Sequence, residues 1–249
     1  MKEIYHLQLT ASDVGRYAIL AGDPARIPVI AEHFESAREV GGYRGFLCYN
    51  GFLDHVRVCA VATGIGCPST AIVVEELITL GVRTFIRVGT CGSLQDDVKP
   101  GELVVSTASI RCEGTTRAYV PIEYPAVADV SVVSSLITAA NQVGAGCRVG
   151  ITHCKDAFYS EIPDRCAGLD DIRGQWATWR RANALVTEME ASALFVLAAL
   201  RRCRAGALFA VVGSVETGDL ISDVTGTVGA IKVAVAAMRS LIRDDQEEH

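Results

Sequence analysis

Residues 84–92 read Thr84-Phe85-Ile86-Arg87-Val88-Gly89-Thr90-Cys91-Gly92, an apolar run that passes into a polar, glycine-rich stretch. The first part, Thr84–Val88, has the β-branched and aromatic composition of a buried strand. We expect Arg87–Gly92 to form the turn at the end of that strand. A guanidinium fork, a hydroxyl and glycines that admit a close ligand together suit anion binding. Such a turn is more often only structural, so the functional interpretation needs partners elsewhere in the chain.

Short apolar runs alternate with helical patterns along the whole sequence. The runs that predict strands are Tyr17–Leu20, Val56–Val61, Thr84–Val88, Leu103–Ser106, Val149–Thr152 and Ala207–Val212. The segments that predict helices are Ser69–Leu80, Val132–Val143, Thr187–Arg202 and Val228–Ile242. This alternation favours an α/β fold, with a mostly parallel or mixed sheet covered by helices on both faces.

We find no linker, repeat or low-complexity tract, so the sequence predicts a single domain over residues 1–249. The charged tail Arg243–His249 is expected to fray. A formal net charge of -6 argues against a general nucleic-acid surface, which normally carries a basic footprint. Any anionic ligand must therefore be bound by local groups.

Nine cysteines are scattered through the chain without a C-x-x-C pair. This pattern indicates buried free thiols in a reducing compartment rather than a zinc or disulfide framework. The first residues lack the apolar core of a signal peptide, and no apolar stretch approaches the ~20 residues that span a bilayer. We therefore expect a cytoplasmic protein that does not interact with a membrane.

Three further segments are candidate partners of Arg87. Gly22 and Arg26 lie in a turn directly after the first predicted strand, and Thr63–Thr70 is a glycine-containing turn before a predicted helix, whose first N–H groups favour anions. The segment Glu188-Met189-Glu190 starts another predicted helix. Each of these is by itself more often structural. Strand ends meet at one edge of an α/β sheet, however, so both arginine turns could face one anion, and a carboxylate there could accept hydrogen bonds from sugar hydroxyls.

These motifs resemble those of the nucleoside phosphorylase I family in order and spacing through nearly the whole chain. The matching residues are Gly22-Asp23-Pro24-x-Arg26, Gly64-Ile65-Gly66-x-Pro68-Ser69-Thr70-x-Ile72-x-x-x-Glu76-Leu77, Arg87-x-Gly89-Thr90-x-Gly92 and Glu188-Met189-Glu190. The resemblance implies a three-layer α/β/α fold with a central mixed, partly barrel-like sheet. It also implies reversible phosphorolysis, in which phosphate attacks C1′ of a nucleoside and releases the base and a (deoxy)ribose 1-phosphate.

The resemblance assigns roles residue by residue. It implies that Arg87, Thr90 and Glu190 are catalytic. Phosphate would bind Gly22, Arg26, Arg44, Arg87 and Thr90, with Arg44 supplied by a neighbouring subunit. Ribose would meet His6, Thr90, Met189 and Glu190, with His6 also from the neighbour. A homo-oligomer follows, a dimer as the minimal unit or a hexamer built from three dimers. The implied reaction needs no metal and no organic cofactor.

The base is the least determined part of the prediction. Residues 83–87 and 121–129 look most like the uridine-cleaving branch of the family, whereas Gly92-Ser93-Leu94 is also similar to purine-cleaving members. The residues that could contact the base are Phe158, Arg165, Glu188 and Glu216. The Asp that protonates a purine has no counterpart near Val212, and the Gln and Arg that bind uracil are absent or displaced after Phe158. Phosphorolysis of uridine is the leading hypothesis. A purine nucleoside phosphorylase, a nucleoside hydrolase and a non-catalytic nucleoside-binding protein are the alternatives.

Overall fold

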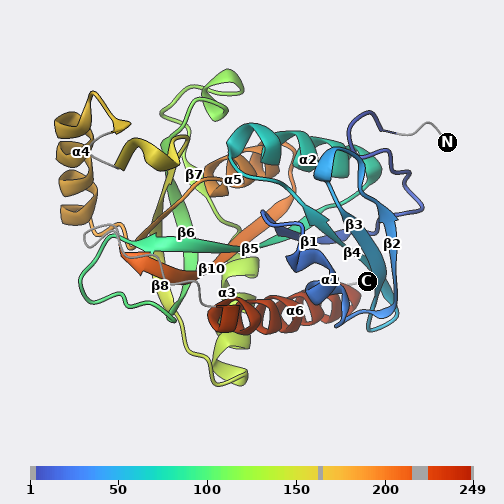
Figure 1. Cartoon of the computed structure of the whole chain (residues 1–249). Helices are drawn as coiled ribbons and strands as arrows, with labels where there is room; N and C mark the ends of the chain where they lie inside the picture. The colour runs from blue at the N-terminus through green and yellow to red at the C-terminus, as the bar shows by residue number, and fades with distance from the viewer. Residues whose placement is uncertain (1–3, 162–164, 215–223, 248–249) are drawn as a thin grey trace.

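The computed structural model describes residues 4–161, 165–214 and 224–247 and shows one continuous mixed sheet between helices (Figure 1). The strands are β1 (Tyr17–Ala21), β2 (Glu35–Gly41), β3 (Cys48–Leu53), β4 (Val56–Ala62), β5 (Thr84–Ser93), β6 (Leu103–Cys112), β7 (Ala126–Val127), β8 (Arg148–Lys155), β9 (Val186–Glu188) and β10 (Arg204–Ser214). The α-helices are α1 (Arg26–Ala31), α2 (Cys67–Leu80), α3 (Val130–Gln142), α4 (Leu169–Arg181), α5 (Ala191–Leu200) and α6 (Val224–Glu247). Short 3-10 turns form η1 (Tyr43–Gly45), η2 (Thr116–Ala118) and η3 (Phe158–Glu161).

The sheet has an open half and a closed half that meet at β5. Strands run in the order β2-β3-β4-β1-β5-β9-β8-β6-β10, and β10 pairs back with β5. Strands β5, β9, β8, β6 and β10 therefore close into a barrel, while β2, β3, β4 and β1 extend it as an open sheet. The short β7 pairs with β6 outside this path. The mixed, partly barrel-like sheet that the family resemblance implies is confirmed.

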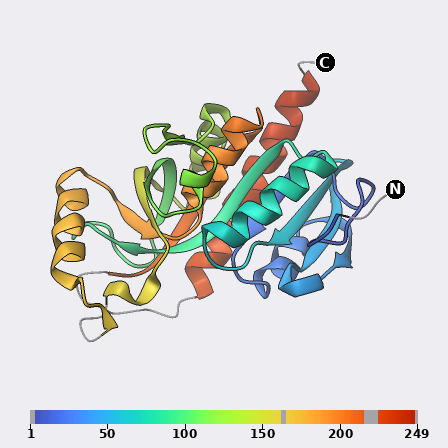
Figure 2. The same ribbon diagram turned by 90° about the horizontal axis from the view of Figure 1, so that it is seen from above.

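Two apolar cores lie on opposite faces of the sheet, as strand alternation requires. In β1, Ala18 and Leu20 belong to the core between the sheet and helices α2 and α5. Ile19 belongs to the core between the sheet and helices α1, α3 and α6. Figure 1 shows α2 and α5 above the sheet and α3 and α6 below it, and Figure 2 gives the view from above. Helix α5 is buried along Ala191–Ala198, which explains its apolar residues on every side. The predicted three layers are thus confirmed.

Strand β5 corrects the prediction that Arg87–Gly92 forms a turn. Parallel pairing with β1 ends at Val88, but pairing with β10 continues along β5 to Ser93, and β9 joins at Gly92 and Ser93. Gly89 fits inside the strand because the ring of its register partner Phe209 covers it; a Cβ there would lie 2.8 Å from that ring. The polar, glycine-rich stretch is therefore extended backbone at the junction of the open sheet and the barrel.

Two smaller predictions also need correction. The predicted helix Thr187–Arg202 begins only at Ala191, because Val186–Glu188 is drawn into the barrel as β9 between β5 and β8. The tail does not fray within the described residues, since α6 continues to Glu247 and Arg204 of β10 is paired with Asp245. The sequence predicted none of β2, β3, α1 or α4. The single-domain organisation of residues 1–249 stays a prediction.

Candidate active site

A buried ion pair between Arg87 and Glu190 lies at the centre of the candidate site. Arg87 shares a face of β5 with Phe85, which packs in the core beneath α2 and α5. Its Nη2 donates to Oε2 of Glu190 at 2.5 Å, and the two residues are 3% and 5% exposed. Glu190 directly precedes α5, so β5 and the start of α5 are joined through these two side chains. Two buried ions are stable only when further polar groups satisfy them.

The turn between β4 and α2 supplies those polar groups. The N–H of Gly66 donates to Oε1 of Glu190 at 2.7 Å, and the hydroxyl of Thr63 accepts from Nη1 of Arg87 at 3.3 Å. Gly64 and Gly66 have φ angles of 67° and 90°, which favour glycine. The sequence predicted free N–H groups at the start of α2; instead the Gly66 N–H holds the Glu190 carboxylate. Thr63 was quoted in the turn but given no role.

The turn after β1 lies directly against Arg87. A Cβ on Gly22 would stand 3.7 Å from Nη2 of Arg87 and 3.2 Å from the carbonyl oxygen of Gly64. Arg26 begins α1 behind this turn, and burial, together with the positive charge of Arg87, lowers its pKa, against the opposing effects of Asp23 and Glu190. The structure therefore brings two arginines and two glycine turns together, as the strand-end argument predicted.

Arg87 keeps one donor available. Its Nε is buried and has no hydrogen-bond partner among the described residues. An unsatisfied buried donor costs free energy, so such a group in a native site calls for an explanation, and an anionic ligand is the simplest one. Thr90, three residues further along β5, is partly exposed. Met189 is also partly exposed, between Glu188 and Glu190.

Glu188 is a second buried carboxylate with unusual electrostatics. It is 4% exposed, and its Oε2 accepts the N–H groups of Glu190 and Ala191, both at 2.8 Å. Its Oε1 is buried without a partner among the described residues. Burial and the negative charge of Glu190 raise the pKa of Glu188 to about 7, although Arg87 and the two N–H groups oppose the shift. Glu188 therefore changes charge near neutral pH.

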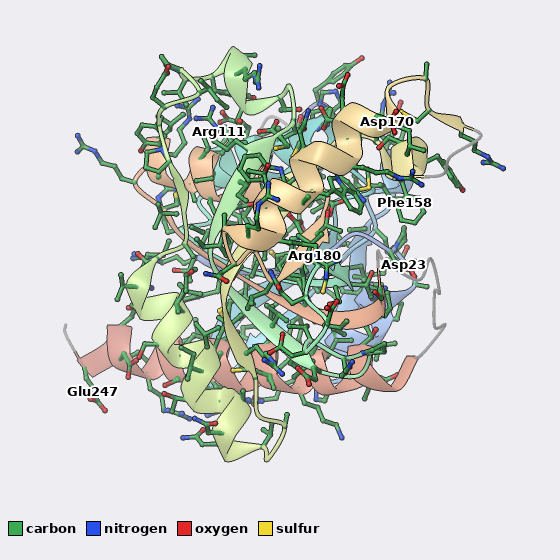
Figure 3. All side chains as sticks on the ribbon, turned by 90° about the vertical axis from the view of Figure 1, so that its left-hand side faces the viewer. Asp23, Arg111, Phe158, Asp170, Arg180 and Glu247 are labelled. Carbon is green, nitrogen blue, oxygen red and sulfur yellow. The ribbon has the colours of Figure 1, made fainter. Side chains whose placement is uncertain are left out.

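The remaining predicted site residues lie on the barrel and on the molecular surface. Phe158 in η3 is 45% exposed, and Arg165 is exposed and stacks on the ring of Tyr159 at 4.9 Å. Figure 3 shows Phe158 on the same side of the view as Asp23 of the first turn. Arg44 is exposed in η1 with its guanidinium 5.3 Å from the Tyr43 ring. Glu216 lies outside the described residues.

His6 is anchored to helix α2. Its Nδ1 lies 2.6 Å from Oε1 of Glu76, and that carboxylate also accepts the N–H groups of His6 and Leu7. The imidazole stays partly exposed, with 32% of its side-chain surface accessible. Sequence reasoning quoted Glu76 in a motif but gave it no role; its three contacts show that it fixes the N-terminal segment.

One group of possible metal ligands gathers within the part of the chain that the structure describes. Ligand atoms of Cys67, Glu113 and Asp156 lie within 4.8 Å of one another. Glu113 accepts the N–H and the hydroxyl of Thr116, and Asp156 accepts the N–H of Gly114 at 2.8 Å. These bonds order the chain between β6 and η2, which gives both carboxylates a structural role. Separately, no helix among the described residues is long and apolar enough to cross a membrane.

The fold and this site together define an α/β protein with a buried guanidinium, two carboxylates and glycine turns at the junction of an open sheet and a barrel. Residues 16–241 match the family model described as "Phosphorylase superfamily". The chain belongs to this superfamily, as the order and spacing of its motifs indicated.

Named relatives cover nearly all of the chain. A uridine phosphorylase of Treponema pallidum (strain Nichols) is 44% identical over 245 residues, 97% of this chain and 95% of that protein. A uridine phosphorylase of Thermococcus kodakarensis is 38% identical over 249 residues, 98% of this chain and 88% of that protein. A guanosine phosphorylase of Halorubrum lacusprofundi is 40% identical over 214 residues, 86% of this chain and 85% of that protein.

The raised pKa of Glu188 predicts a pH-dependent stability. Between about 4.5, the ordinary pKa, and about 7, the folded protein holds a proton that the unfolded chain has released. The contribution of Glu188 to stability therefore falls as pH rises through this window. The neutral variant Glu188→Gln keeps an oxygen for the two N–H groups but cannot ionise. We expect the difference between the unfolding midpoint of Glu188→Gln and that of the wild type to shift in favour of the variant from pH 5 to pH 8.

Thermal unfolding followed by circular dichroism measures this difference. Glu123→Gln, at an exposed position between η2 and β7, is the control and should run parallel to the wild type. Parallel profiles for Glu188→Gln and the wild type over the whole range would contradict the raised pKa.

Proposed function

We propose that the chain catalyses reversible phosphorolysis of a nucleoside, with uridine as the leading substrate, and is thus a pentosyltransferase of pyrimidine salvage. The observation that carries the proposal is the buried Arg87, which is bound to Glu190 on one side, lies against the Gly22 turn and has an Nε donor without a partner among the described residues. This arrangement offers an anion site and a hydroxyl acceptor side by side. Relatives named uridine phosphorylase at 44% and 38% identity over nearly the whole chain support the substrate.

Phosphate would bind at Gly22, Arg26, Arg87 and Thr90. Arg26 and Arg87 repel each other in a partly desolvated site, and a phosphate dianion between them would relieve this repulsion. Guanidinium forks suit the tetrahedral arrangement of phosphate oxygens, and the glycine at position 22 leaves room for an oxygen to reach the backbone. Binding would also give the Nε of Arg87 an acceptor.

Ribose would bind next to the phosphate through Thr90, Met189 and Glu190. A carboxylate accepts hydrogen bonds from vicinal hydroxyls, and Glu190 is already oriented by Arg87 and the N–H of Gly66. In the reaction a phosphate oxygen attacks C1′ as the glycosidic C–N bond breaks, and the electron pair of that bond leaves with the base. Positive charge develops on the sugar, and the adjacent dianion stabilises it before forming the new C–O bond.

The base would lie beside Phe158, with Arg165, Glu188 and Glu216 as further contacts. Glu188 is the best supported of these, because its buried Oε1 has no partner among the described residues and could meet an imide N–H of the base. Phe158 offers a half-exposed ring for stacking. Neither a metal nor an organic cofactor enters the proposal, in which inorganic phosphate is the second substrate.

A neighbouring subunit would complete each site with Arg44 and His6. Arg44 is exposed in η1 between β2 and β3, and the imidazole of His6 is partly accessible beside α2, so a second copy of the chain can reach them. The assembly would be a homodimer, or a hexamer of three dimers. All nine cysteines are free thiols, which supports the cytoplasm as the compartment.

A purine nucleoside is the second candidate substrate. The relative that is 40% identical over 86% of this chain is named guanosine phosphorylase. A carboxylate at position 188 that accepts N–H groups would suit the donor edge of guanine as well as the imide of uracil. The phosphate and ribose parts of the proposal are the same for either base.

A nucleoside panel tests the proposal directly. We expect uridine to release uracil only when phosphate is present, at a higher kcat/KM than thymidine, inosine, guanosine or adenosine; chromatography of the free bases measures this. Preferred cleavage of inosine or guanosine would show a purine nucleoside phosphorylase instead. Base release without phosphate would show a hydrolase, and thermal stabilisation by nucleosides without any product would show a binding protein.

Replacing Arg87 should remove the phosphate site. We expect Arg87→Ala to lose phosphate-dependent thermal stabilisation and to lower kcat/KM for uridine more than about 1,000-fold, since both positioning and charge stabilisation are lost. Because this change leaves Glu190 buried without its cation, Arg87→Lys is made in parallel to keep a charge while removing the fork. Arg83→Ala, at the exposed position directly before the same strand, should retain activity. Near-normal turnover in folded Arg87→Ala would refute the assignment.

Arg44 can be tested by mixing inactive variants. Arg44→Ala and Arg87→Ala should each be nearly inactive as pure proteins. If Arg44 acts in the neighbour's site, each mixed dimer contains one site with both arginines intact. Random exchange of subunits then restores roughly a quarter of the wild-type activity. Mixed dimers that form but show no recovery, with composition verified by native mass spectrometry, would place Arg44 outside the neighbour's site.

A further inference from the structure

Lys155 is a buried cation that the sequence prediction did not single out. It ends β8 and is 8% exposed. Its Nζ lies 5.0 Å from the ring centre of Trp176 on α4 and 5.7 Å from that of Phe158 on η3. Burial lowers the pKa of Lys155 to about 8, while the charges of Glu188 and Cys154 oppose the shift. An ammonium that has lost most of its water interacts strongly with nearby charge.

The surroundings of Lys155 point toward the proposed base position. Phe158 is the proposed stacking ring. It is half-exposed, and the ammonium of Lys155 lies near its ring. Strands β8 and β9 pair with Cys154 opposite Glu188, so Glu188 lies beside the end of β8, and its Oε1 has no partner among the described residues. His153, two residues before Lys155, is uncharged near neutral pH because burial and Lys155 lower its pKa to about 4. Lys155 thus lies beside the Phe158 ring and interacts electrostatically with the Glu188 carboxylate.

Arg165, the other predicted cation for the base, is less well placed. Its guanidinium stacks on Tyr159, which is 58% exposed, and the arginine itself is exposed. Lys155 therefore supplies the most deeply buried positive charge among the described residues next to Phe158.

We infer that the Lys155 ammonium donates a hydrogen bond to a carbonyl oxygen of the departing base and stabilises the negative charge that the base acquires. This inference rests on the proposed phosphorolysis. When the C–N bond breaks, its electron pair goes to the base, and the ring nitrogen shares the charge with the adjacent carbonyl oxygen. Phosphate supplies the electron pair of the new bond to C1′, and the released base anion takes a proton from water. Lys155 keeps its own proton throughout.

The test varies the leaving group as well as the residue. Lys155→Met removes the charge while keeping a long apolar chain against the two rings, and Lys155→Arg restores a charge. Each variant is assayed with uridine and with 5-fluorouridine, whose fluorine stabilises the departing anion. We expect Lys155→Met to lower kcat for uridine about 100-fold, as for loss of one donor to a developing anion. The loss of kcat for 5-fluorouridine should be roughly tenfold smaller than the loss for uridine. Lys155→Arg should recover part of the loss.

Several outcomes separate this inference from the proposed function. Lys232→Met, at an exposed position of α6, should match the wild type with both substrates. Phosphate-dependent thermal stabilisation should persist in Lys155→Met, which shows that the phosphate site is intact. Equal losses on both substrates, or no loss, in an otherwise active enzyme would overturn the role of Lys155 alone. A wild-type protein that fails to phosphorolyse any nucleoside would overturn the proposed function and this role together.

Discussion

The buried pair between Arg87 and Glu190 is the contact on which the arrangement of the site depends. It joins the middle of β5 to the start of α5, and the Gly66 N–H adds the start of α2. Burying two ions costs several kcal/mol for each, and removing one partner typically costs about 3–5 kcal/mol because the other charge is left unpaired. The pair is therefore weak evidence for stability and better evidence for positioning. It holds a cation and a carboxylate in fixed places before any ligand arrives.

Around this pair the charges are only partly balanced. Arg26 and Arg87 repel each other, Glu188 and Glu190 repel each other, and burial opposes the charged form of Glu188 and Lys155 alike. An anion bound between the two arginines and a donor group bound at Glu188 would relieve the repulsion at both ends. Such imbalance is typical of functional sites, where pKa values are shifted by burial combined with specific partners. Among the described residues, Nε of Arg87 and Oε1 of Glu188 have no hydrogen-bond partner, and buried charged groups left this way call for an explanation such as a ligand.

The sequence was sufficient for the parts of the fold that depend on local patterns. Strands β1, β4 and β10 are apolar runs bounded by turns, and α2 carries Pro68 near its start and Gly81, with φ 112°, at its end. The second half of β5 could not be predicted, because its glycines indicate a turn unless the ring of Phe209 is known to cover Gly89. Strand β2 is exposed along Glu35–Glu39 and exists through its pairing with β3. Both failures are cases of tertiary contact overriding local preference.

The residues of the candidate site likewise fall into those that the sequence could predict and those that it could not. Gly22, Arg26, Arg87 and Glu190 could be assembled from sequence because strand ends in an α/β sheet converge and because the motifs are short and local. Lys155 could not, since a lysine in a strand suggests an exposed position, and its burial comes from Trp176 on a helix 21 residues later in the chain. The proposed phosphate end rests on backbone and strand geometry at the junction of sheet and barrel. The proposed base end rests on side chains from β8, η3 and α4.

Helix α4 has no buried residue within its bounds, so the sequence of this helix can vary with little effect on either core. The same fold can therefore keep one nucleophile while the base it releases changes. That separation gives a physical reason why relatives named for uridine and for guanosine resemble this chain to nearly the same degree, 44% and 40% identity. Overall identity weighs every position equally, whereas a preference between bases depends on the few side chains at the barrel end. Under the proposed function those side chains are Lys155, Phe158 and Glu188, and we expect their charges and distances, more than overall identity, to decide which base leaves.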